Sequence, residues 1–385
     1  MPEIYHFCED EKFINSGYAQ FEELYPEQNH FYIYNLNESI PKHIHLNSRF
    51  TIIDNLKKTI EELPEKSIII FHSLPQNIIE HLKFLPKKAI TVGLFFGFEV
   101  YNDPFLYSEN KALSPLTKLY FADKSLTFKK KLKEKIWPIY RIVKKDLYLT
   151  QRERKINALR RLDYFGTSFK EEHVMIQKLL GLKRPVFNFW YYPLEKILET
   201  DAPINLNKSK VMIGNSGFKT NNHLDVFKRL SELKIKNKEI FSPVSYGDQK
   251  YISAIREKAL IPGNTFAFME DFMSLQDYQN VLDDVQVAIL NTRRQQAVGN
   301  IIALIYAGAK VFISERSTFF HYLKRNKIKV FSYEKDLLSH HFDTAFSQKE
   351  IEYNRTILTK IFSSETLKKE LKKSVEEVFS DLKKK

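Results

Sequence analysis

The sequence predicts an α/β protein with two Rossmann-like domains that face a cleft. Short runs rich in β-branched and aromatic residues alternate with helix-periodic stretches along the chain. Such alternation implies parallel sheets covered by helices on both faces. The chain has 385 residues, too many for one ordinary core, and a stretch containing Pro and Asn interrupts the rhythm near residues 192–210. We therefore expect one domain over residues 1–200 and a second over residues 201–385.

Strands of the first domain are expected where short apolar runs are bounded by polar or turn-forming residues. These runs are Ile4–Phe7, Phe31–Tyr34, Phe50–Ile53, Ser67–Phe71, Ile90–Phe96, Leu162–Phe165 and Val186–Trp190. Helices are expected between several of them because apolar residues recur every three to four positions. Two such stretches are Asn77–Leu85 and Lys170–Leu180.

The second domain repeats this rhythm without an internal sequence repeat. Its expected strands are Lys210–Ile213, Glu239–Phe241, Thr265–Phe268, Val285–Leu290, Lys310–Ile313 and Ile328–Phe331. Its expected helices are Asn222–Leu233, Asp248–Leu260, Leu275–Leu282, Gln296–Ala307 and Thr318–Arg325. The basic stretch Leu367–Lys385 is expected to form a closing helix rather than an anchor.

Composition excludes several classes of protein. The single cysteine, Cys8, excludes an internal disulfide framework and fits a reducing compartment. The longest apolar run, Ala89–Phe98, is too short to span a bilayer, which needs about 20 residues. The first residues are acidic, unlike the basic start of a secretion signal. We expect a cytoplasmic protein.

Positive charge is concentrated in the segment Lys129–Arg161, which holds thirteen Lys or Arg residues against three acids. Its apolar residues, including Trp137 and Tyr140, are interleaved with the cations. A basic amphipathic segment of this kind suits an anionic membrane surface. A solvated helical hairpin is the alternative. Nucleic acid is not expected as a partner, because no helix-turn-helix, zinc-finger or aromatic-sheet signature accompanies the charge.

The loops that follow strands are the candidate binding loops, because parallel sheets bind ligands at the carboxyl ends of their strands. The run Val211–Ile213 leads into Gly214, Asn215, Ser216 and Gly217, and then into a helix. A strand that breaks at a glycine before a helix directs backbone N–H groups at an anion, usually a phosphate. Many turns of this type bind nothing, but a second loop of the same kind strengthens the prediction of an anion site.

That second loop, Asn291–Asn300, also runs from a strand into a helix. Arg294 offers a fork of donors to phosphate oxygens, Gln295 and Gln296 offer amides, and Gly299 allows a close approach. Solvated polar residues at a helix start are the alternative interpretation. Two further candidates follow neighbouring strands. Glu315 could accept hydrogen bonds from a ribose or sugar diol, and Tyr246 could stack on the donor molecule or form a hydrogen bond with it. A surface position for Glu315 and a core or turn position for Tyr246 are the alternatives.

In the first domain, His72 and Glu99 are the titratable residues at strand ends, and either one could deprotonate an acceptor hydroxyl. A purely structural role is the alternative for each of them. The histidines show no metal-ligand spacing, so no metal is expected. The chain also lacks an Asp-x-Asp pair, a P-loop, a nucleophile elbow and an early Gly-x-Gly-x-x-Gly. These absences argue against metal-templated nucleotide-sugar chemistry, ATP hydrolysis, esterases and NAD enzymes.

Taken in order, these loops resemble those of the bacterial 4-acetamido-4,6-dideoxy-galactose transferases, the N-acetylfucosaminyltransferases of enterobacterial common antigen assembly. The shared pattern is Gly-Asn-Ser-Gly with Asn-x-His, then Pro-x-x-Tyr, then Arg-Gln-Gln-x-x-Gly, then a Glu after the next strand. It covers residues 67–323 and is strongest in the second domain. The resemblance implies a metal-independent GT-B fold, a TDP-linked amino-sugar donor and an undecaprenyl-pyrophosphate disaccharide acceptor.

The resemblance also implies roles for individual residues. Gly214–Gly217 with Asn221 and His223 would form the diphosphate loop, and Pro243 and Tyr246 would line the donor pocket. Arg294, Gln295, Gln296 and Gly299 would hold phosphate and sugar, and Glu315 would face the ribose or sugar.

The chain departs from the family pattern in the first domain. There Phe96 replaces a tryptophan, Glu99 an aspartate and Ser73 a glycine. These differences leave the acceptor less defined than the donor class.

The leading hypothesis is a glycosyltransferase that moves an N-acetylfucosamine-type sugar from a TDP or UDP carrier, with no cofactor. The acceptor would be a polyprenyl-diphosphate-linked saccharide at the cytosolic face of the inner membrane, where residues 129–161 would dock. One alternative is a GT-B transferase with another nucleotide sugar and a capsule, lipopolysaccharide or protein-glycan acceptor. The other is a protein that binds a nucleotide sugar or a polyanion without turnover.

Overall fold

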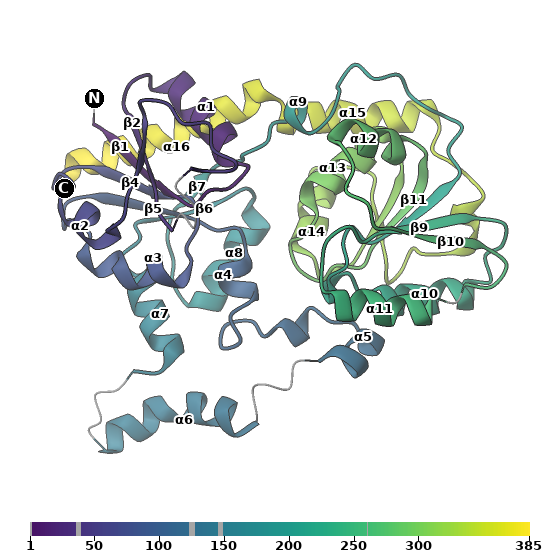
Figure 1. Cartoon of the computed structure of the whole chain (residues 1–385), viewed down its shortest axis with the longest axis horizontal. Coiled ribbons are helices and arrows are strands. Elements are labelled where there is room, and N and C mark those ends of the chain that lie inside the picture. Colours follow the sequence, from purple (N-terminus) through teal and green to yellow (C-terminus); the bar gives the residue numbers. More distant parts are fainter. Residues whose placement is uncertain (1, 36–39, 123–127, 145–148, 260) are drawn as a thin grey trace. The chain divides into compact units, whose positions relative to one another are not determined.

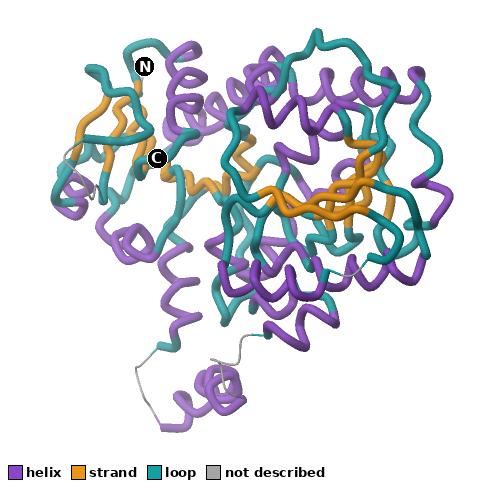
Figure 2. Tube along the Cα trace, turned by 45° about the vertical axis from the view of Figure 1, so that its right-hand side comes forward, coloured by secondary structure: helices purple, strands orange, loops and turns teal. Residues whose placement is uncertain are grey.

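The computed structural model describes the chain except for residues 1, 36–39, 123–127, 145–148 and 260. It divides into two compact units, each built around one parallel sheet (Figure 1). Unit 1 comprises residues 1–107, 126–193 and 364–385, and unit 2 comprises residues 108–125 and 194–363. In both units the strands lie between layers of helices (Figure 2).

The sheet of unit 1 has seven strands in the order β3-β2-β1-β4-β5-β6-β7. Their bounds are β1 Ile4–Cys8, β2 Asn29–Ile33, β3 Phe50–Ile52, β4 Ile68–Phe71, β5 Ile90–Leu94, β6 Tyr164–Thr167 and β7 Val186–Asn188. Its helices are α1 Ile14–Leu24, α2 Leu56–Glu61, α3 Gln76–His81, α4 Phe98–Tyr101, α6 Phe128–Lys144, α7 Gln151–Leu159, α8 Lys170–Leu180 and α16 Ser364–Lys384.

Unit 1 buries apolar residues on both faces of its sheet. On one face, Phe21 of α1 packs with strand residues and with one side of α16. On the other face, α2, α3, α7 and α8 contribute residues such as Ile78, Ile156 and Ile176. The expected strand and helix order is therefore present, and all neighbouring strands pair in parallel.

Unit 2 contains a six-stranded parallel sheet in the order β10-β9-β8-β11-β12-β13. Its strands are β8 Lys210–Ile213, β9 Glu239–Pro243, β10 Thr265–Met269, β11 Val285–Leu290, β12 Lys310–Ile313 and β13 Phe331–Ser332. Its helices are α5 Pro115–Phe121, α9 Leu194–Ile197, α10 His223–Leu233, α11 Gln249–Lys258, α12 Leu275–Asp283, α13 Val298–Ala307, α14 Thr318–Arg325 and α15 Gln348–Phe362. Figure 1 shows α10 and α11 on one side of this sheet and α12, α13 and α15 on the other.

Two segments lie in a different unit from the one that a division at residue 200 assigns to them. The segment 108–125 belongs to unit 2, because Asp225 of α10 accepts hydrogen bonds from the backbone N–H groups of Leu116 (2.8 Å) and Thr117 (2.9 Å) at the start of α5. The last helix, α16, belongs to unit 1, because its apolar side packs on the sheet of that unit. It closes a core, as expected of the C-terminal stretch, but the core is the first one.

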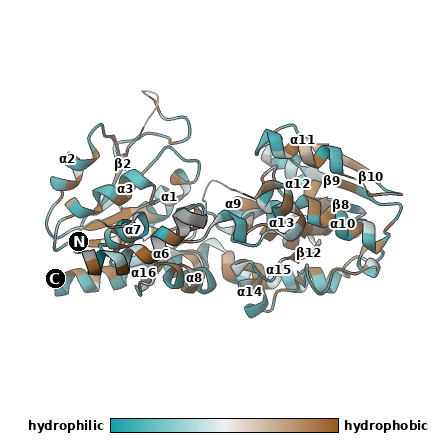
Figure 3. Ribbon diagram, turned by 90° about the horizontal axis from the view of Figure 1, so that it is seen from below, coloured by the Kyte–Doolittle hydropathy of each residue, from teal (hydrophilic) through white to brown (hydrophobic). Residues whose placement is uncertain are grey.

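Among the described residues, none of the helices combines the length and the apolar character needed to cross a bilayer. Hydrophobic and hydrophilic residues alternate along α16 (Figure 3), as the one-sided packing of this helix requires.

Replacing Leu371 of α16 by Ala is expected to destabilise unit 1 by about 2–5 kcal/mol, because the side chain is 1% exposed and its removal leaves a cavity. The measurement is urea denaturation followed by circular dichroism. Lys372→Ala is the control, since its side chain is 60% exposed, and it should change the free energy of unfolding by less than about 0.5 kcal/mol. Equal effects of the two changes would contradict the packing of α16.

Candidate functional site

The strand order places the candidate loops of unit 2 where a doubly wound sheet binds ligands. In the order β10-β9-β8-β11-β12-β13, connections run outward in both directions from the neighbours β8 and β11. The crevice outside the carboxyl ends of two such strands is the usual ligand site of these sheets. The loops that begin at Gly214 and Asn291 follow these two strands.

Gly214 begins the first loop and has a backbone conformation that requires glycine. Its φ is +67°, and a Cβ at this position would lie 2.6 Å from Nε2 of His223 and 3.2 Å from Oδ1 of Asn221. The Asn221 amide holds the loop in shape, because it accepts from the backbone N–H of Asn215 (3.1 Å) and donates to the carbonyl (2.9 Å) and hydroxyl (3.0 Å) oxygens of Ser216. Asn221 is fully buried, so it positions the loop and does not face solvent.

His223 is the first residue of α10 and is also fully buried. The hydroxyl of Tyr251 lies 3.2 Å both from its backbone nitrogen and from its Nδ1. Burial lowers the pKa of His223 to about 3, so the ring is neutral. Its Nε2 is buried, has no hydrogen-bond partner among the described residues and lies against Gly214.

The loop after β9 is fastened to the first loop through two glycines. The backbone N–H of Gly217 donates to the carbonyl of Tyr246 (2.8 Å), and Asp248 donates back to Gly217 (3.1 Å). A Cβ on Gly247, whose φ is +143°, would lie 2.4–2.6 Å from backbone atoms of Gly217. The Tyr246 side chain is half exposed, and its hydroxyl accepts from Nδ2 of Asn215 at 3.3 Å.

The Asn291–Asn300 loop meets the first loop through Gln296. Its Oε1 accepts from the hydroxyl of Thr220 at 2.8 Å, and its Nε2 lies 3.5 Å from Oδ1 of Asn215. Nε of Arg294 lies 3.4 Å from the same Oε1. The Gly214–Gly217 loop and the Asn291–Asn300 loop carry the candidate phosphate-binding residues and are called the two corners below. They are therefore in direct contact within unit 2. Gln295 also lies in this loop, between Arg294 and Gln296.

Helix α13 starts at Val298, two residues after Gln296, and offers an uncapped N-terminus. Ala297 occupies the N-cap position with φ +58° and provides no side-chain cap. The first N–H groups of a helix have no partner within the helix, and its N-terminal end is positive. A Cβ at Gly299 would meet nothing within 4 Å, so open space lies beside this first turn.

Glu315 follows β12, but the described contacts do not join it to these corners. Its carboxylate pairs with Lys335 at 2.8 Å, and hydrogen bonding to that ammonium lowers the pKa of Glu315. The nearest link is Ser317, whose hydroxyl donates to the carbonyl of Arg294 at 3.4 Å.

Asn222 is a residue that the sequence pattern did not single out. It is fully buried, and it accepts from the backbone N–H of Ser114 (2.7 Å) and donates to the carbonyls of Ala112 (3.0 Å) and Asn291 (2.8 Å). This one amide therefore joins the 108–125 segment to both loops. The Asn-Asn-His sequence before a helix is a possible signal, but it does not reveal the distant partners.

In unit 1, Glu99 lies in α4, just beyond the carboxyl end of β5, and is 4% exposed. Its carboxylate accepts hydrogen bonds from the backbone N–H groups of Leu74 (3.4 Å), Phe96 (3.3 Å) and Gly97 (2.9 Å). Burial raises the pKa of Glu99 to about 7, although these hydrogen bonds act in the opposite direction. A carboxyl group with this pKa can gain or lose a proton near neutral pH.

His72 belongs to a buried chain of hydrogen bonds. The Asn29 amide donates to Glu22 (2.9 Å) and to the carbonyl of Tyr25 (2.7 Å), so its oxygen faces Nε2 of His6 at 3.2 Å. Nε2 of His6 is therefore the donor, and its Nδ1 accepts from Nε2 of His72 at 3.0 Å.

The last link of this chain fixes the tautomer of His72. Its Nδ1 accepts from the hydroxyl of Tyr191 at 2.7 Å, and burial lowers the pKa of His72 to about 3. Both ring nitrogens are occupied and the side chain is 1% exposed. The geometry thus assigns His72 to holding Tyr191, and it favours Glu99 as the proton acceptor of the two candidates.

No group of three or more His, Cys, Asp or Glu residues is placed to hold a metal ion within the described part of the chain.

Comparison with known families identifies the type of enzyme. Residues 187–374, which include nearly all of the second unit, match the family described as 4-alpha-L-fucosyltransferase, glycosyl transferase group 56. The chain is a glycosyltransferase. The resemblance seen in the loop motifs is confirmed over this range, which contains every candidate donor-binding residue named above.

Solved structures support the fold of this glycosyltransferase over the full chain. Sucrose-phosphate synthase from Thermosynechococcus elongatus has a TM-score of 0.59 at 10% identity, covering 99% of this chain and 100% of the other. The α,α-trehalose 6-phosphate synthase of Burkholderia multivorans has a TM-score of 0.56 at 10% identity, covering 100% and 98%. An E. coli trehalose-6-phosphate protein bound with UDP-2-fluoro glucose has a TM-score of 0.57 at 9% identity, covering 99% of each chain. The expected GT-B class, with two Rossmann-like units, is confirmed.

The raised pKa of Glu99 predicts a pH-dependent penalty to stability. The folded-state pKa of about 7 exceeds the ordinary value of 4.5, so the stability that Glu99 contributes is complete below about pH 4.5 and is lost as the pH rises through 7. Glu99→Gln cannot ionise and escapes this loss. Between pH 5 and pH 8 the wild type should lose roughly 3 kcal/mol of unfolding free energy relative to the variant. Denaturation at both pH values measures the difference.

Glu65→Gln is the control for this comparison, because Glu65 is an exposed carboxyl of the same unit. Its stability should follow that of the wild type at both pH values. A constant difference between the wild type and Glu99→Gln would contradict the ionisation of Glu99 near neutral pH.

Proposed function

We propose that this enzyme transfers a 4-acetamido-4,6-dideoxyhexose from a nucleoside diphosphate to a polyprenyl-diphosphate-linked saccharide at a membrane surface. The observation that carries the donor side is the contact of the two corners in unit 2. Gln296 joins the Gly214 loop to the loop of Arg294, at the switch point of a doubly wound sheet. The choice of donor sugar and acceptor rests on the loop motifs and on the matched family.

The corners supply what a diphosphate leaving group needs. Arg294 offers a guanidinium, and the uncapped start of α13 offers backbone N–H groups. Such fixed donors stabilise the negative charge that develops as the bond between the anomeric carbon and the diphosphate oxygen breaks. We propose that they do so without a metal ion.

In the same step, the hydroxyl oxygen of the acceptor forms a bond to the anomeric carbon and releases its proton. We assign that proton to the carboxylate of Glu99, whose pKa of about 7 fits the transfer.

Arg294→Ala should reduce transfer by a factor of about 100 or more, because one fixed donor to a developing oxyanion contributes about 3 kcal/mol. Transfer of radiolabelled sugar from TDP-4-acetamido-4,6-dideoxygalactose to a lipid extract measures it, with EDTA present throughout. Arg325→Ala on α14 removes a guanidinium outside the loops and should retain activity. Unchanged turnover in Arg294→Ala would exclude it from the site, and a strict requirement for added metal would exclude the metal-free mechanism.

A second candidate function is transfer of a different nucleotide sugar, with a capsule, lipopolysaccharide or protein-glycan acceptor. The corners bind the diphosphate in either case, so the same assay with UDP-N-acetylglucosamine as donor distinguishes the two.

Helix α6 supports the membrane part of the proposal. Leu132, Ile136, Ile139 and Val143 are spaced by three or four residues, so they share one side of the helix. They are 43%, 48%, 66% and 73% exposed, respectively. An exposed apolar side flanked by lysines fits an anionic bilayer, where apolar burial and charge attraction act together.

Ile139→Glu with Val143→Glu should abolish flotation of the protein with phosphatidylglycerol vesicles, because it places two acids in the apolar side. Replacing Tyr353 of α15 and Leu338, two other exposed apolar residues, by Glu is the control and should leave flotation unchanged. If the α6 variant floats like the wild type, α6 is not the docking helix.

A further inference from the structure

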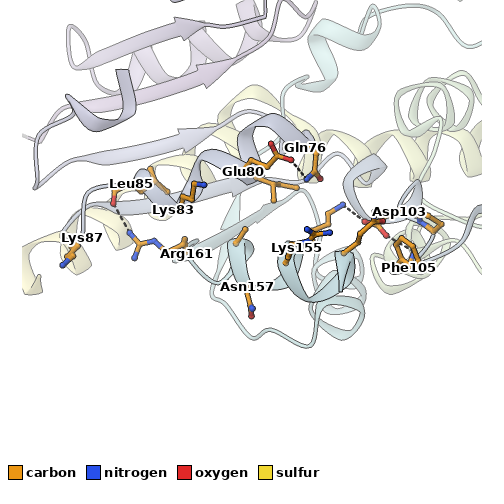
Figure 4. A pocket seen from close by; sticks show the side chains of 15 residues that line it. Gln76, Glu80, Lys83, Leu85, Lys87, Asp103, Phe105, Lys155, Asn157 and Arg161 are labelled. Atoms are coloured by element: carbon orange, nitrogen blue, oxygen red, sulfur yellow. Dashed lines mark hydrogen bonds and ion pairs between the residues drawn. The ribbon is translucent and has the colours of Figure 1, made fainter. Parts of the chain in front are cut away.

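A long groove runs between α3 and α7 in unit 1, separate from the residues assigned above to the donor. Its volume is about 1080 Å³. Figure 4 shows its lining, with Gln76, Asp103 and Lys155 toward one end and Lys87 and Arg161 toward the other. Buried apolar residues of α3 and the segment after it, including Ile79 and Leu85, form part of its wall.

The groove carries an excess of positive charge. Five cations line it, and the acids that line it are Glu80 and Asp103. The cations are Lys83, Lys87, Arg154, Lys155 and Arg161. Asp103 is already paired with Lys155 at 2.9 Å, and Glu80 accepts from Gln76 at 2.9 Å.

Most of the other cations have no acidic partner. Within the described residues, Lys83, Lys87 and Arg154 form no ion pair with a carboxylate, and all three are exposed. A guanidinium N–H of Arg161 donates to the carbonyl of Leu85 at 3.0 Å, which spans the groove at its far end. Like charges that line one groove repel one another, so this lining fits a ligand with more than one negative charge.

One end of the groove adjoins the segment that carries Glu99. The ammonium of Lys155 donates to the backbone carbonyl of Glu99 at 2.5 Å as well as to Asp103. Lys155 therefore lines the groove and also holds α4 in place through this hydrogen bond. A ligand in the groove lies beside the turn that positions the proposed proton acceptor.

Helix α6, the proposed membrane contact, is joined by an ion pair to α7, which lines the groove. Arg141 of α6 makes a bidentate ion pair with Glu153 of α7, in which Nη1 and Nη2 lie 2.8 and 2.9 Å from the two carboxylate oxygens. Glu153 also completes the capping box with Thr150 that starts α7. The exposed apolar side of α6 and the basic groove therefore belong to neighbouring, connected helices of one unit.

We infer that the groove between α3 and α7 binds the diphosphate of the prenyl-linked acceptor, an inference that rests on the proposed function. Lys83, Lys87 and Arg154 pair with the diphosphate oxygens. Pro104 and Phe105, which are apolar lining residues with accessible surface, contact the first isoprene units. The volume exceeds what one phosphate needs and accommodates both parts.

The test measures binding of farnesyl diphosphate to the full chain by calorimetry, with farnesol and inorganic pyrophosphate as partial probes. Lys83→Glu with Arg154→Glu should weaken farnesyl diphosphate binding at least about tenfold. Lys170→Glu with Lys178→Glu on α8 makes the same change in net charge away from the groove and should not weaken it. All four side chains are exposed, so the fold should be retained, which circular dichroism checks.

Arg294→Ala separates this site from the donor site. Farnesyl diphosphate binding that survives Arg294→Ala but is lost in the groove variant supports the inference, whatever the transfer assay shows. Binding that is unchanged in the groove variant overturns it. If the groove variant loses vesicle flotation but keeps farnesyl diphosphate binding, the inference is also overturned, and the groove is a contact for bulk phospholipid.

Discussion

Two buried side-chain amides hold the second unit's binding edge together. The loops that follow parallel strands carry backbone groups that cannot pair within the sheet, and a buried group without a partner costs about 1–3 kcal/mol. Asn221 satisfies such groups inside the Gly214 loop. Asn222 satisfies groups from Ala112 and Ser114 in the 108–125 segment and from Asn291 in the loop after β11. The positions of both corners, and of the helices that follow them, depend on these two residues.

The corresponding edge of the first unit uses burial differently. The same removal from water that keeps His72 neutral also raises the pKa of Glu99, so neither residue imposes a fixed charge there at pH 7. In the second unit, Arg294 keeps its charge at any physiological pH. This edge of the second unit therefore carries a permanent positive charge that suits an anion, whereas the first unit's edge is suited to exchange a proton with a neutral hydroxyl group.

Much of the fold follows from local pattern, because a buried parallel strand is a short apolar run and each helix shows its own periodicity. The strand runs and the Gly214 and Arg294 loops were visible for this reason. Long-range partners were not visible. Nothing near His72 in the sequence reveals His6 or Tyr191, which lie 66 and 119 residues away. The burial of Glu99 and the pairing of Glu315 with Lys335 likewise depend on tertiary contacts, which local sequence periodicity does not reveal.

The position of α16 has a consequence for synthesis of the chain on the ribosome. Residues 108–125 and 194–363 make up the second unit, so all of its segments have been translated before α16 begins at Ser364. The first unit must wait, with one apolar face of its sheet covered by α1 but not by α16, until that helix has left the exit tunnel. Domains usually fold in the order of their translation, but here the later one is able to finish first. The nascent first unit is thus the part that most needs protection from aggregation.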